Sequence, residues 1–428
     1  MSVKPSHILG MNARHKYTSL NTSASKQYGF SKLKTKELLV RHNIPTAMVY
    51  HVCSTMSDLE ALRWEAVPVP FVIKPANSSA GKGIWVIKDK VADKAIWKNS
   101  FGENLTADDL SLHVNNILDG EFGVWGSDHK AIIEEMIVAH PAIAKYAYKG
   151  TPDVRIIVFN SVPVMAEARI PTKESQGKAN LDQGAIGLGV DMATGVTTYG
   201  ITGKSGFITH FPGTKKKVNG IIIPNWTKLL ETAVTASNAA GYQFMGADLF
   251  VHAEKGPMIV ELNGFPGLSI QLCNRAGLKR RLERVEGLEV RDAKHGVKIS
   301  QALFAESFAD NIKIEEGLKI ISTNPTISVF DDHGKLHNFD VLVNTGRYRS
   351  AISEQLAKEL GLVDLEDLLW RQQEEIEGKV PVVSLSFKLK GHKVETAVVV
   401  SKRLNRTNHK IELGRKDVQG FLIGETEE

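Results

Sequence analysis

The chain has 428 residues, of which 42% are hydrophobic and 24% are charged, so a soluble globular protein of two or three domains is expected. The net charge of +5 suits small anionic ligands but is too weak to indicate nucleic-acid binding. Two cysteines, Cys53 and Cys273, cannot form a disulfide framework, which favours a reducing, cytoplasmic setting. The N-terminus has no signal-peptide core, and no apolar run reaches the roughly 18–20 residues of a membrane span, so no membrane partner is expected.

In chain order, residues 1–30 are polar and are expected to be irregular. Apolar residues at helical spacing predict a helix from Ser31 that stops before Pro45, with Ser31 as a possible cap. The polar, glycine-rich stretch 171–189 is expected to be an active-site loop. Strands are expected at 71–74, 84–87, 131–137, 154–159 and 162–170, and helices at 106–118, 225–240 and 278–309.

A loop of small residues follows the strand that delivers Lys74. It contains Ser78, Ser79, Gly81, Lys82 and Gly83, and small residues let backbone N–H groups approach a phosphate closely. The pattern is not a Walker A loop, because Gly83 stands where Ser or Thr is required. Taken alone, it is more often an ordinary hairpin.

Two apolar runs between Met245 and Ser269 flank the turn residues AEKGP and predict an antiparallel hairpin. Glu261 and Asn263 are two positions apart, so they point to the same side of one strand, and Asp248 on the other strand can face them. Oxygen ligands of this kind, with positions left for water and phosphate, favour Mg²⁺.

Basic and amide side chains lie between these two motifs. Arg155 and Arg169 are predicted on strands, where a buried arginine is usually paired or bound to an anion. Both are candidates to clamp a transferring phosphoryl group. The alternative for Arg155 is a salt bridge with Asp153 or Glu134. Lys178 and Asn180 lie on the glycine-rich loop.

The order of lysine, small-residue loop, IIEEMI, D-x-R, basic residue, Asp and E-x-N resembles an ATP-grasp ligase over residues 7–285. GKANLDQGAIGLGVD and LNGFPGLSIQ are similar to the glutamate-ligase-like branch of that family. The resemblance implies an α+β fold in which two subdomains clamp ATP, within an expected domain 1–318. Two departures are visible: Ser31 precedes Lys32 where the family usually has Asp, and the motif starts too early for a full N-terminal domain.

The resemblance also implies roles for residues. Lys32, Lys74 and Lys178 would bind the nucleotide, Ser78 to Gly83 would close over its phosphates, and Glu134, Glu135 and Ile137 would lie on the strand that holds adenine. Asp248, Glu261 and Asn263 would bind one or two Mg²⁺ ions. Catalytic contacts to the acyl phosphate would come from Arg155, Arg169 and Asn180.

From about residue 319 the elements are short and β-rich, which predicts a small, mostly β barrel over 319–428, with helices at 350–360 and 365–375. FDVLVNTGRYRSAIS resembles the active-site turn of retropepsin-like aspartic proteases. Asn344 stands in the Asp position of that turn. Aspartic proteolysis needs two carboxylates that share a proton, so a binding or regulatory module is expected instead.

The leading hypothesis is therefore an ATP- and Mg²⁺-dependent carboxylate–amine ligase that acts on an amino acid or peptide through an acyl phosphate. The partners expected are a carboxylate substrate and an amine, with glutamate suggested only by the resemblance. A retropepsin-type peptidase gated by ATP and a non-catalytic ATP-binding scaffold are the alternatives. A homo-oligomer through the C-terminal domain stays open.

Overall fold

The computed structural model describes residues 3–78, 81–91, 94–123, 128–203, 206–304, 319–364, 368–374, 377–418 and 421–424. The chain divides into two compact units, Met1–Val190 with Gly195–Arg284, and Asp191–Thr194 with Val285–Glu428. This division assigns residues 285–304 to the second unit. The expected domain boundary at 318/319 stays a prediction.

The N-terminal residues are helical, so the expectation of an irregular segment over 1–30 was wrong. The elements are η1 (Pro5–His7), α1 (Met11–Thr18), α2 (Ser23–Phe30) and α3 (Lys32–Arg41). Tertiary contacts hold α1, because Tyr17 is buried edge-on against Phe159 with ring centroids 5.3 Å apart. The Asn21 amide also donates to Phe244 O at 2.7 Å. As predicted, α3 begins after Ser31, whose hydroxyl accepts from the Lys34 N–H.

The first sheet lies in the first unit, and its strand order among the described residues is β1-β6-β2-β3-β4-β5. Its core includes Phe71, Ile73 and Trp97, against which α5 packs Leu110 and Val114. A Thr106–Asp109 capping box starts α5 at the predicted place. The elements are β1 (Val49–Cys53), α4 (Met56–Glu60), η2 (Trp64–Ala66), β2 (Phe71–Pro75), β3 (Trp85–Lys90), β4 (Ile96–Asn99), β5 (Asn104–Thr106), α5 (Ala107–Leu118) and β6 (Ala131–Glu135).

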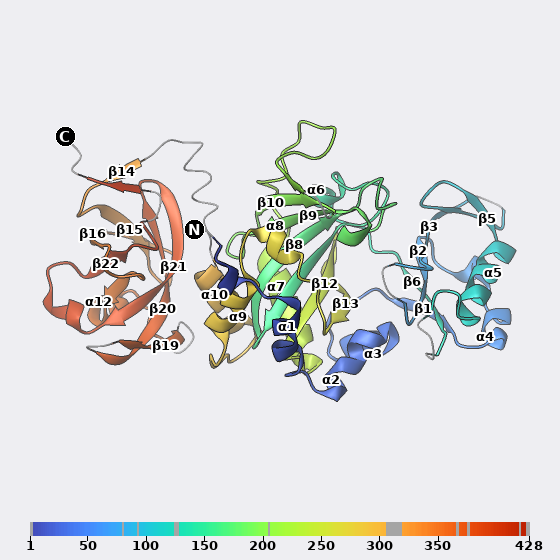
Figure 1. The fold of residues 1–428 in the computed structure, drawn as a ribbon, viewed down its shortest axis with the longest axis horizontal. Coiled ribbons are helices and arrows are strands. Elements are labelled where there is room, and N and C mark those ends of the chain that lie inside the picture. The colour runs from blue at the N-terminus through green and yellow to red at the C-terminus, as the bar shows by residue number, and fades with distance from the viewer. Residues whose placement is uncertain are drawn as a thin grey trace. The chain divides into compact units, whose positions relative to one another are not determined.

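The second sheet, also in the first unit, has the order β11-β10-β9-β8-β7-β12-β13 over the part of the chain described (Figure 1). All residues of β8 are buried, because α8 packs near β8 and β9 while α7 packs on β13, β12, β7 and β8. The elements are α6 (Pro141–Ala144), β7 (Asp153–Phe159), β8 (Val162–Ile170), η3 (Leu181–Gln183), β9 (Ile186–Val190), β10 (Thr197–Thr202), β11 (Gly206–Ile208), α7 (Trp226–Ala239), β12 (Phe244–His252), β13 (Gly256–Asn263), α8 (Ile270–Asn274) and α9 (Leu278–Val285).

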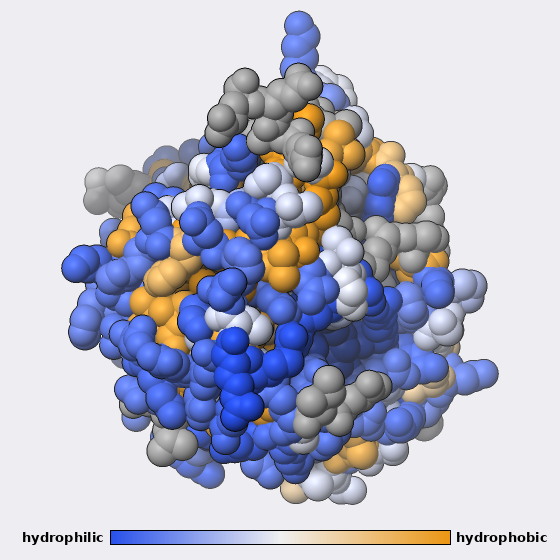
Figure 2. All heavy atoms as spheres, turned by 90° about the vertical axis from the view of Figure 1, so that its left-hand side faces the viewer, coloured by the Kyte–Doolittle hydropathy of each residue, from blue (hydrophilic) through white to orange (hydrophobic). Residues whose placement is uncertain are grey.

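The second unit is mostly β, as expected, and its larger sheet has the order β16-β15-β20-β21-β18-β22-β17 with β19 on β20 in the described ranges. The surface seen in Figure 2 is mainly hydrophilic, with apolar areas separated by polar ones. The elements are α10 (Ala293–Phe304), β14 (Lys319–Ile321), β15 (Thr326–Phe330), β16 (Leu336–Asp340), β17 (Leu342–Asn344), β18 (Ala351–Ser353), α12 (Glu354–Glu359), β19 (Leu368–Glu374), β20 (Gly378–Leu389), β21 (His392–Ser401), η4 (Arg403–Arg406), β22 (Ile411–Gly414) and β23 (Phe421–Ile423).

Three expected helices differ from the structure. The helix expected at 350–360 begins only at Glu354, because Ala351–Ser353 form β18. The helix expected at 365–375 was wrong over Leu368–Glu374, which forms β19 and alternates in burial as a paired strand does. The helix expected at 278–309 is two helices, α9 and α10, separated by Gly287 at φ +75°. Its last residues, 305–309, lie outside the described ranges. Of the helices described, none combines the length and apolar character that crossing a bilayer requires.

Candidate active site

Charged residues form a row across one face of the second sheet. The predicted hairpin is confirmed, because β12 and β13 are antiparallel neighbours and Asp248 is the partner of Glu261. On its other side Asp248 is the partner of Arg155 on β7, and Arg155 is the partner of Glu167 on β8. Residues directly opposite on neighbouring strands point to the same face, so four strands bring these side chains together.

Asp248 is held by two guanidinium groups. Arg155 donates to it through Nε and Nη2, both at 2.7 Å, and Arg169 Nη2 donates at 2.8 Å. Burial alone would raise the pKa of Asp248, but the two arginines outweigh it and lower the pKa to about 2. Asp248 therefore holds a full negative charge in the row.

Arg169 is paired in the same way with Asp153. Its Nε donates to Asp153 Oδ1 at 2.6 Å and its Nη2 donates to Oδ2. Burial nevertheless raises the pKa of Asp153 to about 6 in spite of Arg169. The salt bridge weighed as an alternative for Arg155 does form, but its partner is Asp248 rather than Asp153 or Glu134. The pairing does not exclude a role as a clamp.

Glu261 differs from Asp248, because burial and the neighbouring Asp248 carboxylate outweigh the cations around it. Burial raises the pKa of Glu261, nearby Asp248 raises it further, and Lys32 opposes the rise. Asn263 ends β13, and its Oδ1 accepts from the Phe265 N–H at 2.8 Å. Asp248 and Asn263 are not direct partners, since Asn263 is opposite Gly246.

The charge of the row fits a divalent cation. Within the described residues of this face, four carboxylates (Asp153, Glu167, Asp248 and Glu261) meet the two guanidinium groups of Arg155 and Arg169. No group of three or more His, Cys, Asp or Glu in the described ranges is arranged to enclose a metal. An ion here would need the Asn263 amide oxygen, water or phosphate to complete its coordination shell. Mg²⁺ is commonly bound in this way, by one or two carboxylates together with water and phosphate oxygens.

Lys32, one of the predicted nucleotide-binding lysines, lies close to Glu261 in this row. Lys32 Nζ donates to Ser78 O at 2.6 Å, so α3 contacts the loop of small residues. Burial lowers the pKa of Lys32, and Glu261 opposes this. Lys32 and Ser78 also line a pocket. Its residues are Tyr28, Gly29, Phe30, Lys32, Thr35, Ser78, Val260 and Glu261.

A buried ion triad joins α3, β2 and β6. Glu134 pairs with Lys74 at 2.5 Å and with Lys36 at 2.8 Å. Burial would raise the pKa of Glu134, but Lys74 and Lys36 outweigh it and lower the pKa. The pKa of Lys36 falls to about 8 because burial outweighs the attraction of Glu134. The triad fixes the Lys74 side chain between two strands and a helix.

The remaining residues of the predicted adenine strand have other contacts. The Glu135 carboxylate pairs with Lys255, and the backbone N–H of Glu135 donates to Met48 O at 2.8 Å. Ile137 is buried with Ala47 and Met258. These contacts leave the expected adenine-holding role of this strand as a prediction.

The loop of small residues approaches the glycine-rich stretch 171–189. A Cβ added at Gly81 would lie 3.5 Å from Lys178 Cδ, so Lys178 extends beside the loop. Gly83 has φ +69°, and an added Cβ would meet the Phe122 ring at 2.6 Å, so a side chain is excluded there. Lys82 is exposed, and Ser79 lies outside the described residues.

Asn180 caps the short helix η3, where its side chain accepts from the Asp182 N–H at 2.9 Å. This local contact accounts for its position without a ligand. Its predicted catalytic role therefore stays a prediction.

Two residues of the site were not predicted from the sequence. Lys36 follows Lys32 by four positions and therefore shares its face of α3, a signal that the sequence does carry. Glu167 is 1% exposed and accepts from Cys273 Sγ at 3.1 Å. A glutamate inside the apolar strand pattern MAEARI, two positions before Arg169, was the available signal.

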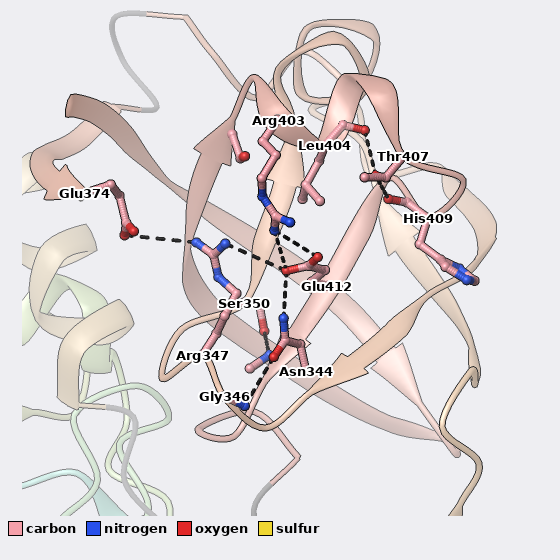
Figure 3. Close-up of polar contacts among 12 residues, drawn as sticks. Asn344, Gly346, Arg347, Ser350, Glu374, Arg403, Leu404, Thr407, His409 and Glu412 are labelled. Carbon is pink, nitrogen blue, oxygen red and sulfur yellow. Dashed lines mark hydrogen bonds and ion pairs between the residues drawn. The ribbon is translucent and has the colours of Figure 1, made fainter. Parts of the chain in front are cut away.

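The second unit carries a separate polar cluster around Glu412 on β22 (Figure 3). Arg403 Nη2 donates to its two carboxylate oxygens at 3.0 and 3.1 Å, and Arg347 lies 3.7 Å away. Asn344 Nδ2 donates to Glu412 Oε2 at 3.1 Å, while Asn344 Oδ1 accepts from the Gly346 N–H. The amide nitrogen and the amide oxygen of Asn344 therefore each form a hydrogen bond. The retropepsin-like resemblance of this unit stays a prediction.

Comparison with curated proteins finds ligases over part of the chain. Over 127 residues the chain is 30% identical to a phosphoribosylamine–glycine ligase of Phenylobacterium zucineum (strain HLK1), covering 26% of this chain and 30% of that enzyme. Over 117 residues it is 31% identical to the phosphoribosylamine–glycine ligase of Yersinia pestis, covering 27% and 22%. The chain thus matches less than a third of the length of either relative.

Solved structures resemble the chain loosely. A biotin carboxylase–beta-gamma-ATP complex from Campylobacter jejuni has a TM-score of 0.41 and 13% identity, covering 64% of this chain and 50% of that one. A D-alanine–D-alanine ligase from Bacillus anthracis complexed with ATP has a TM-score of 0.35 and 14% identity, covering 69% and 71%. Scores this low support no argument about substrate or mechanism.

A family model described as sugar-transfer associated ATP-grasp matches residues 11–287, which is well over half of the chain. This match confirms the ATP-grasp expectation, and ATP-grasp ligases use ATP with Mg²⁺. It does not confirm the glutamate-ligase-like branch. The chain belongs to the sugar-transfer-associated ATP-grasp family.

Proposed function

We propose that this protein is an ATP- and Mg²⁺-dependent carboxylate–amine ligase that forms an amide or peptide bond through an acyl phosphate. The observation that carries the proposal is the charged row Glu261–Asp248–Arg155–Glu167, with Arg169 and Asp153 beside it. A buried face with more carboxylates than guanidinium groups suits a divalent cation and the phosphates that it accompanies.

The nucleotide would lie between α3 and the loop of small residues. Lys32 and Lys74 would neutralise its phosphates, and Lys178 beside Gly81 would add a third positive charge. Ser78 to Gly83 would supply backbone N–H groups to the phosphates. The strand residues Glu134 to Ile137 would hold the adenine, with Glu134 fixing Lys74 through their ion pair.

Asp248, Glu261 and Asn263 would hold Mg²⁺, which screens phosphate charge and orients phosphate oxygens when it is bound. Asp248 is already paired with two arginines, so Glu261 and Asn263 would supply the less engaged oxygens. Arg155 uses Nε and Nη2 on Asp248, and its Nη1 lies 3.8 Å from where a Cβ would stand at Gly267. That nitrogen would contact the transferred phosphoryl group.

The chemistry has two steps. A substrate carboxylate oxygen attacks the γ-phosphorus of ATP, and the bond between that phosphorus and the oxygen bridging it to the β-phosphate breaks. ADP is the leaving group, and the substrate becomes an acyl phosphate. An amine then attacks the acyl carbon, loses a proton, and displaces inorganic phosphate. Arg155 and Arg169 would stabilise the negative charge on the transferred group, while the rest of the site positions the reactants.

The second substrate and the branch of the family belong to the proposal. The glutamate-ligase-like motifs suggest glutamate or another amino acid, added to a peptide, protein or small-molecule acceptor. Both cysteines are free and buried, which fits the reducing cytoplasm. We place the protein there.

For the C-terminal unit we propose a retropepsin-like binding or regulatory module without protease activity. Support comes from Glu412, whose carboxylate is engaged by Arg403 and by the Asn344 amide. An Asn344→Asp variant would put a second carboxylate beside Glu412. If the parent chain itself cleaves peptides in a quenched-fluorescence assay, the proposed inactivity is wrong.

A substrate screen tests the ligase. The protein is incubated with ATP, Mg²⁺ and pairwise mixtures of amino acids and short peptides, and released phosphate is measured. We expect release that requires both a carboxylate and an amine, with an amide product found by mass spectrometry. Phosphate release that depends on neither the carboxylate nor the amine would contradict the proposal. Absence of phosphate release with every pair would contradict it as well.

A further inference from the structure

Arg14 on α1 is a buried cation without an acidic partner in the described part of the chain. It is 7% exposed, and the hydrogen bond it donates runs from Nη1 to Pro266 O at 2.9 Å. Its Nε is buried and has no hydrogen-bond partner. Burial lowers the pKa of Arg14, and no carboxylate opposes this. A buried guanidinium left in this state is suited to an anionic ligand.

The unpaired edge of the Arg14 guanidinium, which includes the buried Nε, corresponds to the edge that binds carboxylates elsewhere in this protein. Arg155 holds Asp248 through Nε and Nη2, and Arg169 holds Asp153 through the same two nitrogens. In Arg14 the Nη1 side is occupied by Pro266, and the Nε–Nη2 edge is not used by any described residue. That edge presents two parallel N–H donors, which match the two oxygens of a carboxylate.

Arg14 also lies beside the proposed reaction centre. Its guanidinium is 3.6 Å from the centroid of the Phe265 ring, and Phe265 is 47% exposed. Phe265 and Pro266 belong to the loop that begins at Asn263. The next residue, Gly267, approaches Arg155 Nη1. One short loop therefore separates Arg14 from the proposed Mg²⁺ ligand and the phosphoryl clamp.

The position of α1 is fixed rather than incidental. Leu9 N donates to Gln271 Oε1 at 2.8 Å before the helix, and Asn21 binds the Phe244 backbone after it. These contacts hold Arg14 against the loop whether or not a ligand is present. The site is therefore preorganised, which reduces the entropy lost on binding.

We propose that the Nε–Nη2 edge of Arg14 binds a carboxylate of the amino-acid or peptide substrate, with Phe265 at the rim of the site. This inference rests on the proposed ligase function and adds a substrate-binding residue to it. Arg14 acts in recognition and takes no part in phosphoryl transfer.

Ligand-induced thermal stabilisation tests the site without requiring turnover. The full chain is loaded with ADP and Mg²⁺ and titrated with the protein amino acids and with their corresponding carboxamides. We expect stabilisation by at least one free carboxylate and not by its amide. In Arg14→Met, which keeps an apolar stem against Phe265, the affinity should fall about ten- to hundredfold, as for a lost bidentate charge-assisted pair.

Two further variants separate recognition from folding. Arg14→Lys keeps the charge but loses the fork, so it should bind with intermediate affinity. Arg41→Met removes an exposed arginine of α3 and should bind like the parent. Unchanged affinity in both Arg14 variants, or a parent protein that no amino acid stabilises, overturns the inference. Loss of the ADP–Mg²⁺ response in the parent would instead refute the nucleotide site on which the proposed function depends.

Discussion

Asp248 and Glu261 are neighbours in the proposed Mg²⁺ site, yet substitution should affect them in opposite ways. Asp248 accepts three hydrogen bonds from Arg155 and Arg169, and its pKa falls from 3.8 to about 2. That lowering corresponds to roughly 2 kcal/mol in favour of the ionised form. Removing one partner from a buried ion pair costs about 3–5 kcal/mol. Asp248→Asn should therefore destabilise the first unit by about 2–5 kcal/mol.

Glu261 has a raised pKa because it is buried and faces Asp248, so its charge opposes folding at neutral pH. Glu261→Gln should leave the free energy of unfolding unchanged or increase it. The rate of ADP formation should fall sharply, because an anionic metal ligand is lost. The contribution of Asp248 should be present above pH 3.8 and be lost as the pH falls towards about 2.

Urea unfolding followed by tryptophan fluorescence measures both variants, and hydrogen exchange in peptides from β7 and β12 assigns the change to the first unit. Glu37→Gln, which neutralises an exposed residue of α3, is the matched control. The reasoning is refuted if Asp248→Asn is as stable as the parent, or if Glu261→Gln loses as much stability as Asp248→Asn.

Three other predictions follow from burial and backbone geometry. Lys36→Met should destabilise the first unit by about 3–5 kcal/mol at pH 7, because it removes one of the two lysines that pair with the buried Glu134 carboxylate; urea unfolding measures the loss, and a variant as stable as the parent would contradict it. Gly83→Ala should raise the KM for ATP and also lower the melting temperature, since φ is +69° and Phe122 occupies the space; an unchanged KM would mean that the loop does not contact the nucleotide. Tyr17→Ala should destabilise the first unit by about 3–5 kcal/mol and expose α1 to proteolysis, whereas resistance equal to the parent would show that α1 is held by other contacts.

The local elements near the site were predictable because their signals are local. The Ser31 cap, the Thr106 start of α5 and the AEKGP turn each specify a helix or hairpin through neighbouring residues. The period of two also placed Glu261 and Asn263 on one side of β13. The sequence by itself therefore determined the hairpin, the loop of small residues and, by resemblance, the ATP-grasp family.

Partner choice within the site was decided by the tertiary structure. Arg155 pairs with Asp248, 93 positions away, because β7 lies beside β12 in the sheet, and no local pattern encodes that neighbour. Sequence spacing likewise gave no reason to place Lys36 on Glu134 or the unpaired Arg14 behind the Asn263 loop. Secondary structure follows from short-range sterics and hydrogen bonds, whereas ion pairing depends on which strands and helices pack together, and only the folded chain specifies that.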